Sequence, residues 1–184
     1  MLVNLSQQQL ATLLQGELRQ PTSQLINSVT LSAQASQVGR AFFALAGQRY
    51  HGHNFVSQAL ANKASLAVVE EFQPSSLAQL KVTSTQEALT QLAAYNRQLF
   101  TQPVIAITGN SGKTTVKEIL AAFLEAHFIQ QAKPVAAVKS PHKLTQVLAT
   151  RGNLNNHLGV PLTLLELQPQ HQTAVVEFVA NHLG

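Results

Sequence analysis

The sequence predicts an α/β protein in which at least part of the sheet is parallel. Short apolar runs typical of buried strands alternate with stretches whose apolar residues recur at helical spacing, as in parallel sheets with crossover helices. Hydrophobic residues make up 45% of the chain and charged residues 11%, which is enough apolar surface for a packed core. A strand, a glycine-rich turn and a helix also follow one another around Gly109. The length of 184 residues suits one or two domains of this class.

The N-terminal part of the chain is predicted to begin with a short helix. Apolar residues recur at helical spacing between positions 5 and 18, with Ser6 suited to cap the helix and Gly16 near its end. The next elements are predicted, in chain order, as apolar runs at 25–31 and 41–46 (the second typical of a buried strand), a loop at 47–54, a helix at 55–64, short strands at 66–69 and 80–83, and a helix from Ser84 or Thr85 to about Phe100. We therefore expect one domain over residues 1–99 and a second over residues 100–184.

Composition and charge argue against several classes of function. The net charge of +4 comes from scattered residues, and no basic cluster is interleaved with aromatic residues, so we expect no nucleic-acid partner. The absence of cysteine excludes disulfides and thiolate zinc sites. The sequence starts without the pattern of a secretory signal and contains no run of about 18 apolar residues, so we expect no membrane partner and a cytoplasmic location.

The stretch around residues 104–116 predicts a nucleotide-phosphate loop. An apolar strand at 104–107 leads into a turn in which Gly109 and Gly112 allow the backbone to bend and approach a ligand closely. The helix that follows, from 113 to about 128, directs its N-terminal N–H groups at the same place. Lys113 is predicted to reach the β- and γ-phosphates as the catalytic cation, and the Thr114 hydroxyl to ligate Mg²⁺. The predicted nucleotide-binding residues are Thr108, Gly109, Asn110, Ser111, Gly112, Lys113, Thr114 and Thr115.

This loop departs from the general phosphate-loop pattern at one position. The pattern has a glycine five residues before Gly112, where this sequence has Ile107, and the first glycine is instead Gly109. The alternative interpretation is an ordinary helix N-terminus in which Gly-Lys-Thr occurs by chance. The strand, both glycines, the lysine and the paired threonines fall in register, which favours phosphate binding.

Four stretches together resemble the Mur ligase family. The variant loop at 104–116 is similar to that of these enzymes. The run Gly-Asn-Leu-Asn-Asn at 152–156, with Leu-Gly-Val-Pro at 158–161, resembles the loop and helix start after the first helix of their central domain. Residues 174–182 resemble the next strand, which ends in a metal-binding glutamate, and residues 42–55 resemble an N-terminal segment that helps to hold the UDP-sugar. The resemblance covers nearly the whole chain.

The resemblance implies an ATP-dependent ligase that joins amino acids or peptides to the UDP-muramyl peptide precursor of peptidoglycan, with ATP and Mg²⁺ as cofactors. It implies that Glu177 is a Mg²⁺ ligand together with Thr114, the alternative being an exposed glutamate at a strand end. The continuation at 115–118 and the asparagine-rich loop resemble the branch of the family that adds D-alanyl-D-alanine to UDP-N-acetylmuramoyl-tripeptide. The residues implied to line the substrate cleft, for each of which a turn role stays open, are Asn153, Asn156, Asn181 and His182.

The chain also differs from the family pattern. Ser32 and Gln34 stand where an Asp-x-Arg element is expected, which would weaken UDP binding, and Val179 stands in place of a glycine. The connection between Lys117 and Arg151 is longer than expected, with residues 133–143 as additional material that is either a natural insertion or the trace of a sequence disruption. The sequence ends at Gly184, before the rest of the central sheet and the C-terminal domain of the family, so we expect an incomplete ATP-binding domain with about two of its strands.

Three functions follow as alternatives. The first is the N-terminal portion of such a ligase, inactive alone and completed by a complementing C-terminal chain. The second is a non-catalytic remnant that binds nucleotide or UDP-muramyl peptide weakly. The third is a plain P-loop NTPase or kinase, which Glu177 disfavours because an aspartate is expected there. The seven histidines are expected to lie on the surface or in a cleft, because His51 and His53 have no third zinc ligand in register.

Overall fold

The structure is a computed structural model that describes residues 1–2, 4–47, 51–131 and 146–179. The predicted additional segment at 133–143, and the predicted site residues Asn181 and His182, lie outside these residues. The chain forms two compact units, Met1–Asn96 and Arg97–Gly184, and each is described by itself. The elements are α-helices and mostly parallel strands, so the predicted α/β class is confirmed.

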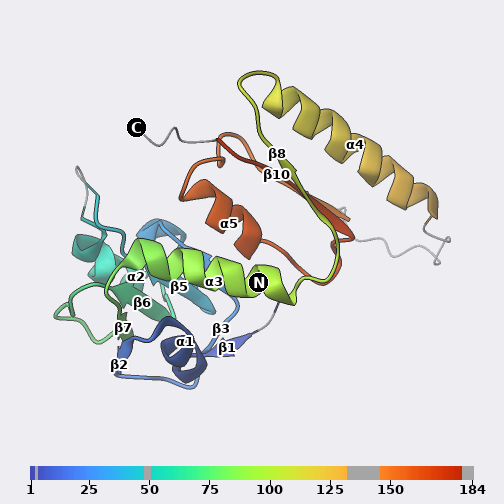
Figure 1. Ribbon diagram of the computed structural model, residues 1–184. Coiled ribbons are helices and arrows are strands. Elements are labelled where there is room, and N and C mark those ends of the chain that lie inside the picture. Colours follow the sequence, from blue (N-terminus) through green and yellow to red (C-terminus); the bar gives the residue numbers. More distant parts are fainter. Residues whose placement is uncertain (3, 48–50, 132–145, 180–184) are drawn as a thin grey trace. The chain divides into compact units, whose positions relative to one another are not determined.

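The N-terminal unit is built on a five-stranded sheet of order β2-β7-β6-β5-β4 (Figure 1). Strands β4 to β7 run parallel, and β2 pairs antiparallel with β7 at one edge. The strands of this sheet are β2 (Glu17–Arg19), β4 (Ser28–Thr30), β5 (Arg40–Phe43), β6 (Leu66–Val69) and β7 (Gln79–Lys81). The central strand β6 is buried along its whole length, because a parallel sheet needs cover on both faces.

The predicted first helix is present as α1 (Gln7–Leu14), preceded by β1 (Leu5–Ser6), which pairs with β3 (Leu25–Ile26). The Ser6 side chain accepts from the backbone N–H of Gln9, and the Gln9 side chain accepts from Ser6, which is a capping box. Gly16 follows the helix, and a Cβ there would lie 2.6 Å from the Lys81 carbonyl oxygen on β7. The glycine therefore permits the close approach that lets β2, which the sequence did not predict, join the sheet edge.

Two further helices complete this unit. Helix α2 (Val56–Ala61) follows two short 3₁₀ turns, η1 (Ala33–Ala35) and η2 (Gly52–Phe55), and is shorter than predicted. Helix α3 (Thr85–Leu99) matches its prediction, and the Ser84 hydroxyl accepts from Glu87 N–H in its first turn. It buries Leu89, Leu92 and Ala93 on one face, which is the apolar face that predicted it.

The C-terminal unit contains a three-stranded parallel sheet of order β8-β10-β9. Its strands are β8 (Val104–Ile107), β9 (Val147–Ala149) and β10 (Thr173–Glu177). Helix α4 (Lys113–Gln131) contacts all three strands, and α5 (Gly159–Leu165) contacts β10; Figure 1 shows the two helices on opposite faces of this sheet. In a parallel sheet the C-terminal ends of the strands meet at one edge, so the turn after β8 and the end of β10 lie side by side.

The expectation of two strands in this unit was wrong, because β9 is a third. It is three residues long and follows the segment that was predicted to be additional material. Its position is established by pairing of Val147 with Thr173 and of Leu148 with Ala174, a contact between distant parts of the sequence. No helix among the described residues is long and apolar enough to cross a membrane.

Candidate nucleotide and metal site

The predicted phosphate loop lies between β8 and α4, with every residue from 108 to 112 exposed. Gly109 has φ 143° and Gly112 has φ 76°, which are backbone conformations that residues with a Cβ rarely adopt. The Lys113 Nζ donates to the Gly109 carbonyl at 2.7 Å, so this side chain folds back over the loop. The loop therefore combines two glycines at positive φ with a lysine, features that are typical of phosphate-binding loops.

Glu177 lies at the C-terminal end of β10, beside this loop, and is 1% exposed. Its carboxylate accepts hydrogen bonds from the Thr114 hydroxyl at 3.1 and 3.3 Å, and from the Asn155 amide at 2.8 Å. Thr114 is the second residue of α4, so the carboxylate also lies near the positive end of that helix dipole. The structure thus brings together the two residues predicted to hold Mg²⁺, and the glutamate is buried rather than exposed.

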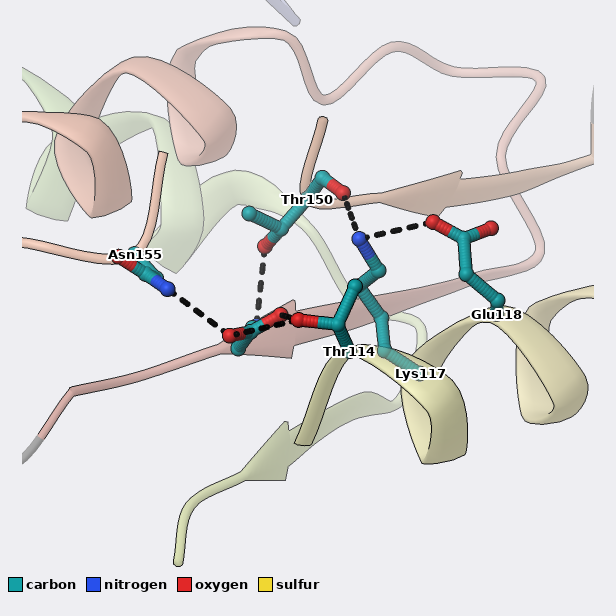
Figure 2. Close-up of polar contacts among 6 residues, drawn as sticks. Thr114, Lys117, Glu118, Thr150 and Asn155 are labelled. Carbon is teal, nitrogen blue, oxygen red and sulfur yellow. Dashed lines mark hydrogen bonds and ion pairs between the residues drawn. The ribbon is translucent and has the colours of Figure 1, made fainter. Parts of the chain in front are cut away.

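A second group of contacts lies behind Glu177. The Thr150 hydroxyl accepts from Glu177 N–H at 2.9 Å, and Thr150 N–H donates to the Val175 carbonyl at 3.0 Å. Lys117, one turn after Thr114, is 0% exposed and donates from Nζ to the Thr150 carbonyl at 2.7 Å. Figure 2 shows the Lys117 amino group between Thr150 and Glu118, whose carboxylate is 2.9 Å away.

The donor set around Glu177 fits a hard divalent cation. Among the described residues Glu177 has no ion-pair partner, and its hydrogen-bond donors Thr114 and Asn155 are neutral. A buried carboxylate without a compensating positive charge is costly, so a bound cation would relieve it. Mg²⁺ is bound in nucleotide sites by one or two protein oxygens together with phosphate oxygens, which the Thr114 hydroxyl and Glu177 can provide. In keeping with so small a protein donor set, the described residues contain no group of three or more His, Asp or Glu suited to a metal.

The asparagine-rich turn follows β9 and contains two of the residues predicted to line the substrate cleft, for which a turn role was left open. Asn153 is exposed in the turn after β9. The Asn156 side-chain oxygen accepts from Leu158 N–H at 3.1 Å and Gly159 N–H at 2.8 Å, so it holds the turn that leads into α5. Asn155, which was not among the predicted residues, is the one that contacts Glu177. The signal for it was present in the run at 152–156, but the run does not reveal which asparagine faces the carboxylate.

The N-terminal unit contains a cavity of about 420 Å³, lined by Ala46, His51, His53, Asn54, Glu70, Glu71 and Gln73. Four of these belong to the stretch at 42–55 that resembles a UDP-sugar-binding segment. His53 Nε2 accepts from Glu70 N–H at 2.8 Å, and the Glu70 carboxylate accepts from the N–H and hydroxyl of Thr85 at 2.8 and 2.9 Å. One wall of the cavity is therefore held by a chain of hydrogen bonds from η2, through Glu70 directly after β6, to α3.

The unusual stretch with Ser32 and Gln34 forms the turn around η1. The Thr30 hydroxyl donates to the Ser32 carbonyl and accepts from Ser32 N–H, both at 3.1 Å. These contacts join the Thr30 hydroxyl to the Ser32 backbone and hold the turn in place.

Residues 107–184 match the family model described as the Mur ligase middle domain, which includes the loop, Lys117, Thr150, Asn155 and Glu177. Residues 107–184 of the chain belong to the Mur ligase family. It is 38% identical over 183 residues to the UDP-N-acetylmuramoyl-tripeptide--D-alanyl-D-alanine ligase of Escherichia coli (strain K12), covering 100% of this chain and 36% of the relative. It is 31% identical over 181 residues to the enzyme of the same name from Bacillus subtilis (strain 168), covering 95% of this chain and 36% of that relative.

Solved structures of Mur ligases agree with this assignment. A crystal structure of MurF from Acinetobacter baumannii is 41% identical, with a TM-score of 0.82, and the match covers 100% of this chain and 37% of that one. MurF ligase from Thermotoga maritima in complex with ADP is 30% identical with a TM-score of 0.67, covering 84% of this chain and 32% of that one. The chain thus spans about a third of the length of the Mur ligases it matches.

Proposed function

We propose that this chain binds Mg-ATP at the phosphate loop and forms part of a ligase that joins D-alanyl-D-alanine to UDP-N-acetylmuramoyl-tripeptide. The observation that carries the proposal is the contact between Thr114 and the buried Glu177 at 3.1 Å beside a loop with left-handed glycines. The similarity of nearly the whole chain to ligases that bear this name supports it.

Each residue of the site has a part in this proposal. Lys113, which folds over the loop, moves its amino group from the Gly109 carbonyl to the phosphate oxygens when nucleotide binds. Thr114 and Glu177 would hold Mg²⁺, which would supply neutralisation of the phosphate charge. The loop N–H groups and the N-terminus of α4 orient the γ-phosphate.

The proposed reaction is a phosphoryl transfer followed by an acyl transfer. A carboxylate oxygen of the muramyl tripeptide attacks the γ-phosphorus, ADP leaves, and an acyl phosphate results. The amine of D-alanyl-D-alanine then attacks the acyl carbon, phosphate leaves, and the amine loses a proton. We propose this complete reaction for the longer protein, or for this chain together with a complementing C-terminal chain, because the chain spans about a third of its relatives.

We also propose that the cavity of the N-terminal unit contributes to binding of the UDP-muramyl peptide. Four of its lining residues come from the segment that resembles the UDP-sugar segment of the family. His53 is engaged with the Glu70 backbone, which leaves His51 and Asn54 as the candidates for ligand contact in that segment. Saturable binding of UDP that weakens in His51→Ala would support this role, and equal binding in both proteins would exclude it.

A non-catalytic nucleotide-binding remnant is the second candidate, favoured by one observation. Helix α4 leaves Val116, Ile119 and Phe123 between 53% and 69% exposed, so an apolar face directly after the loop has no cover among the described residues. A unit that lacks cover at this helix can hold nucleotide without closing over it.

Calorimetric titration of the chain with Mg-ATP tests the proposal, with Lys113→Ala as the site variant and Lys81→Ala as the control. Lys81 is an exposed lysine on β7 of the other unit, so its removal changes the net charge equally without touching the loop. Saturable binding that is lost only in Lys113→Ala would support an assembled loop. If the wild-type chain shows the circular dichroism spectrum of a folded α/β protein but binds no Mg-ATP, the proposed nucleotide binding is refuted. Product formation on addition of both substrates would then separate the ligase from the remnant.

A further inference from the structure

The side chain of Lys117 is fully buried, although its position on α4 is in the first two turns of an otherwise exposed helix segment. Lysine is almost never fully buried unless its amino group is paired. One partner is the Glu118 carboxylate at 2.9 Å, which belongs to a side chain that is 66% exposed and so lies on the solvent side of the buried amino group. The interior partner is the Thr150 carbonyl at 2.7 Å, and the amino group is therefore directed at the end of β9.

Thr150 links three parts of the C-terminal unit. Its N–H donates to Val175 on β10, its hydroxyl accepts from Glu177 N–H, and its carbonyl accepts from Lys117. Both of the contacts with β10 hold the last residues of that strand. The contact with Lys117 is the one that ties Thr150 to α4.

These contacts form a closed ring. Lys117 and Thr114 lie three residues apart on α4 and so share one face of the helix. From Lys117 the ring passes to Thr150, then to the backbone of Glu177, and returns through the Glu177 carboxylate to the Thr114 hydroxyl. The ring therefore links the two oxygen donors of the candidate metal site, the Thr114 hydroxyl and the Glu177 carboxylate, through contacts on the side away from the loop.

We infer that Lys117 is a positioning residue which, through Thr150, holds the Glu177 carboxylate at the distance from Thr114 that a divalent cation requires. This inference rests on the proposed binding of Mg-ATP. Partners that orient metal ligands commonly change metal affinity by about 10- to 100-fold when removed. Lys117 touches neither nucleotide nor metal in this scheme, so its loss weakens the metal-dependent part of nucleotide binding and leaves the loop contacts in place.

The test compares Lys117→Met with Glu118→Gln in the full chain. Methionine retains an unbranched side chain in the buried space but removes the amino group, whereas Glu118→Gln removes the exposed partner of Lys117 and leaves the ring intact. ATP affinity is measured by calorimetry with Mg²⁺ and with a chelator. We expect the enhancement by Mg²⁺ to fall about tenfold in Lys117→Met, with little change of the affinity in chelator, and Glu118→Gln to behave as wild type.

A second readout needs no nucleotide. The Glu177 amide hydrogen is protected by its bond to Thr150, so its exchange with solvent is expected to accelerate in Lys117→Met relative to the amides of β8. If Lys117→Met does not fold, Thr150→Val, which removes the hydroxyl, and Thr150→Ser, which restores it, test the same ring: only the valine variant is expected to lose the Mg²⁺ enhancement.

Three results would separate the possibilities. An unchanged Mg²⁺ enhancement together with unchanged Glu177 exchange in Lys117→Met would overturn the inference. An equal loss of ATP affinity with and without Mg²⁺ would show a general structural role and would also overturn it. A wild-type chain that binds no Mg-ATP would refute the proposed function, and the exchange of Glu177 alone would then decide whether Lys117 positions this residue.

Discussion

Replacing Asn155 with alanine is expected to destabilise the C-terminal unit in the absence of metal by about 1.5–3 kcal/mol, the range for a hydrogen bond to a charged group. Asn155 donates to the Glu177 carboxylate at 2.8 Å, and Glu177 is 1% exposed, so water has little access to replace the lost amide. The matched control is Asn153→Ala, an exposed asparagine two residues earlier in the same turn, expected to change stability by less than about 0.5 kcal/mol.

The assay must report on one unit. Urea titration followed through amide NMR signals of Val175 and Val176 on β10 does so, because both residues are fully buried in the C-terminal sheet. If Asn155→Ala and Asn153→Ala unfold within about 0.5 kcal/mol of each other, the contact with Glu177 carries no net stability and the account of the site fails. Asn155→Asp adds a second carboxylate at this position, so it is expected to destabilise the unit further and to regain part of the loss when Mg²⁺ is added.

Three further predictions follow from the same unit. Glu177→Gln retains the shape of the side chain but removes its charge, so Mg-ATP should stabilise the chain no more than ATP with a chelator does, whereas wild type gains about 2.7 kcal/mol at a hundredfold excess over Kd in thermal unfolding. Gly112→Ala meets no atom within 4 Å but must adopt φ 76°, so it should cost about 1–2 kcal/mol in chemical unfolding and lower ATP affinity in calorimetry. Burial lowers the pKa of His171 from its ordinary value of 6.5, with Glu125 opposing the shift. The unfolded chain therefore takes up this proton at higher pH than the folded one, and stability should fall as the pH drops through about 6.5; His171→Gln should flatten this dependence in urea titrations at several pH values, and exposed His157→Gln should not.

The parts of the fold that the sequence predicts are those with strong local signals. Ser6 and Gln9 form the capping box that marks the start of α1, and the apolar run at 66–69 is the fully buried β6. Strands β2 and β9 were missed because each is only three residues long and neither carries a continuous apolar run long enough to stand out. Their existence depends on pairing with β7 and β10, which are distant in sequence.

The residues of the candidate site also fall into those that a local sequence pattern predicts and those that only strand pairing brings into place. The loop and Glu177 were predicted because the loop is local in sequence and the glutamate ends a recognisable strand. Lys117, Thr150 and Asn155 were not, since each acquires its partner only when β9 pairs in parallel beside β10 and brings Thr150 to Glu177 N–H. A local pattern therefore predicts which groups touch a ligand, while the groups that hold them in position depend on strand order. Lys117 is the clearest example. The helical pattern alone would place a lysine in solvent, and the reason for its burial is the Thr150 carbonyl at the end of β9, which accepts from its amino group.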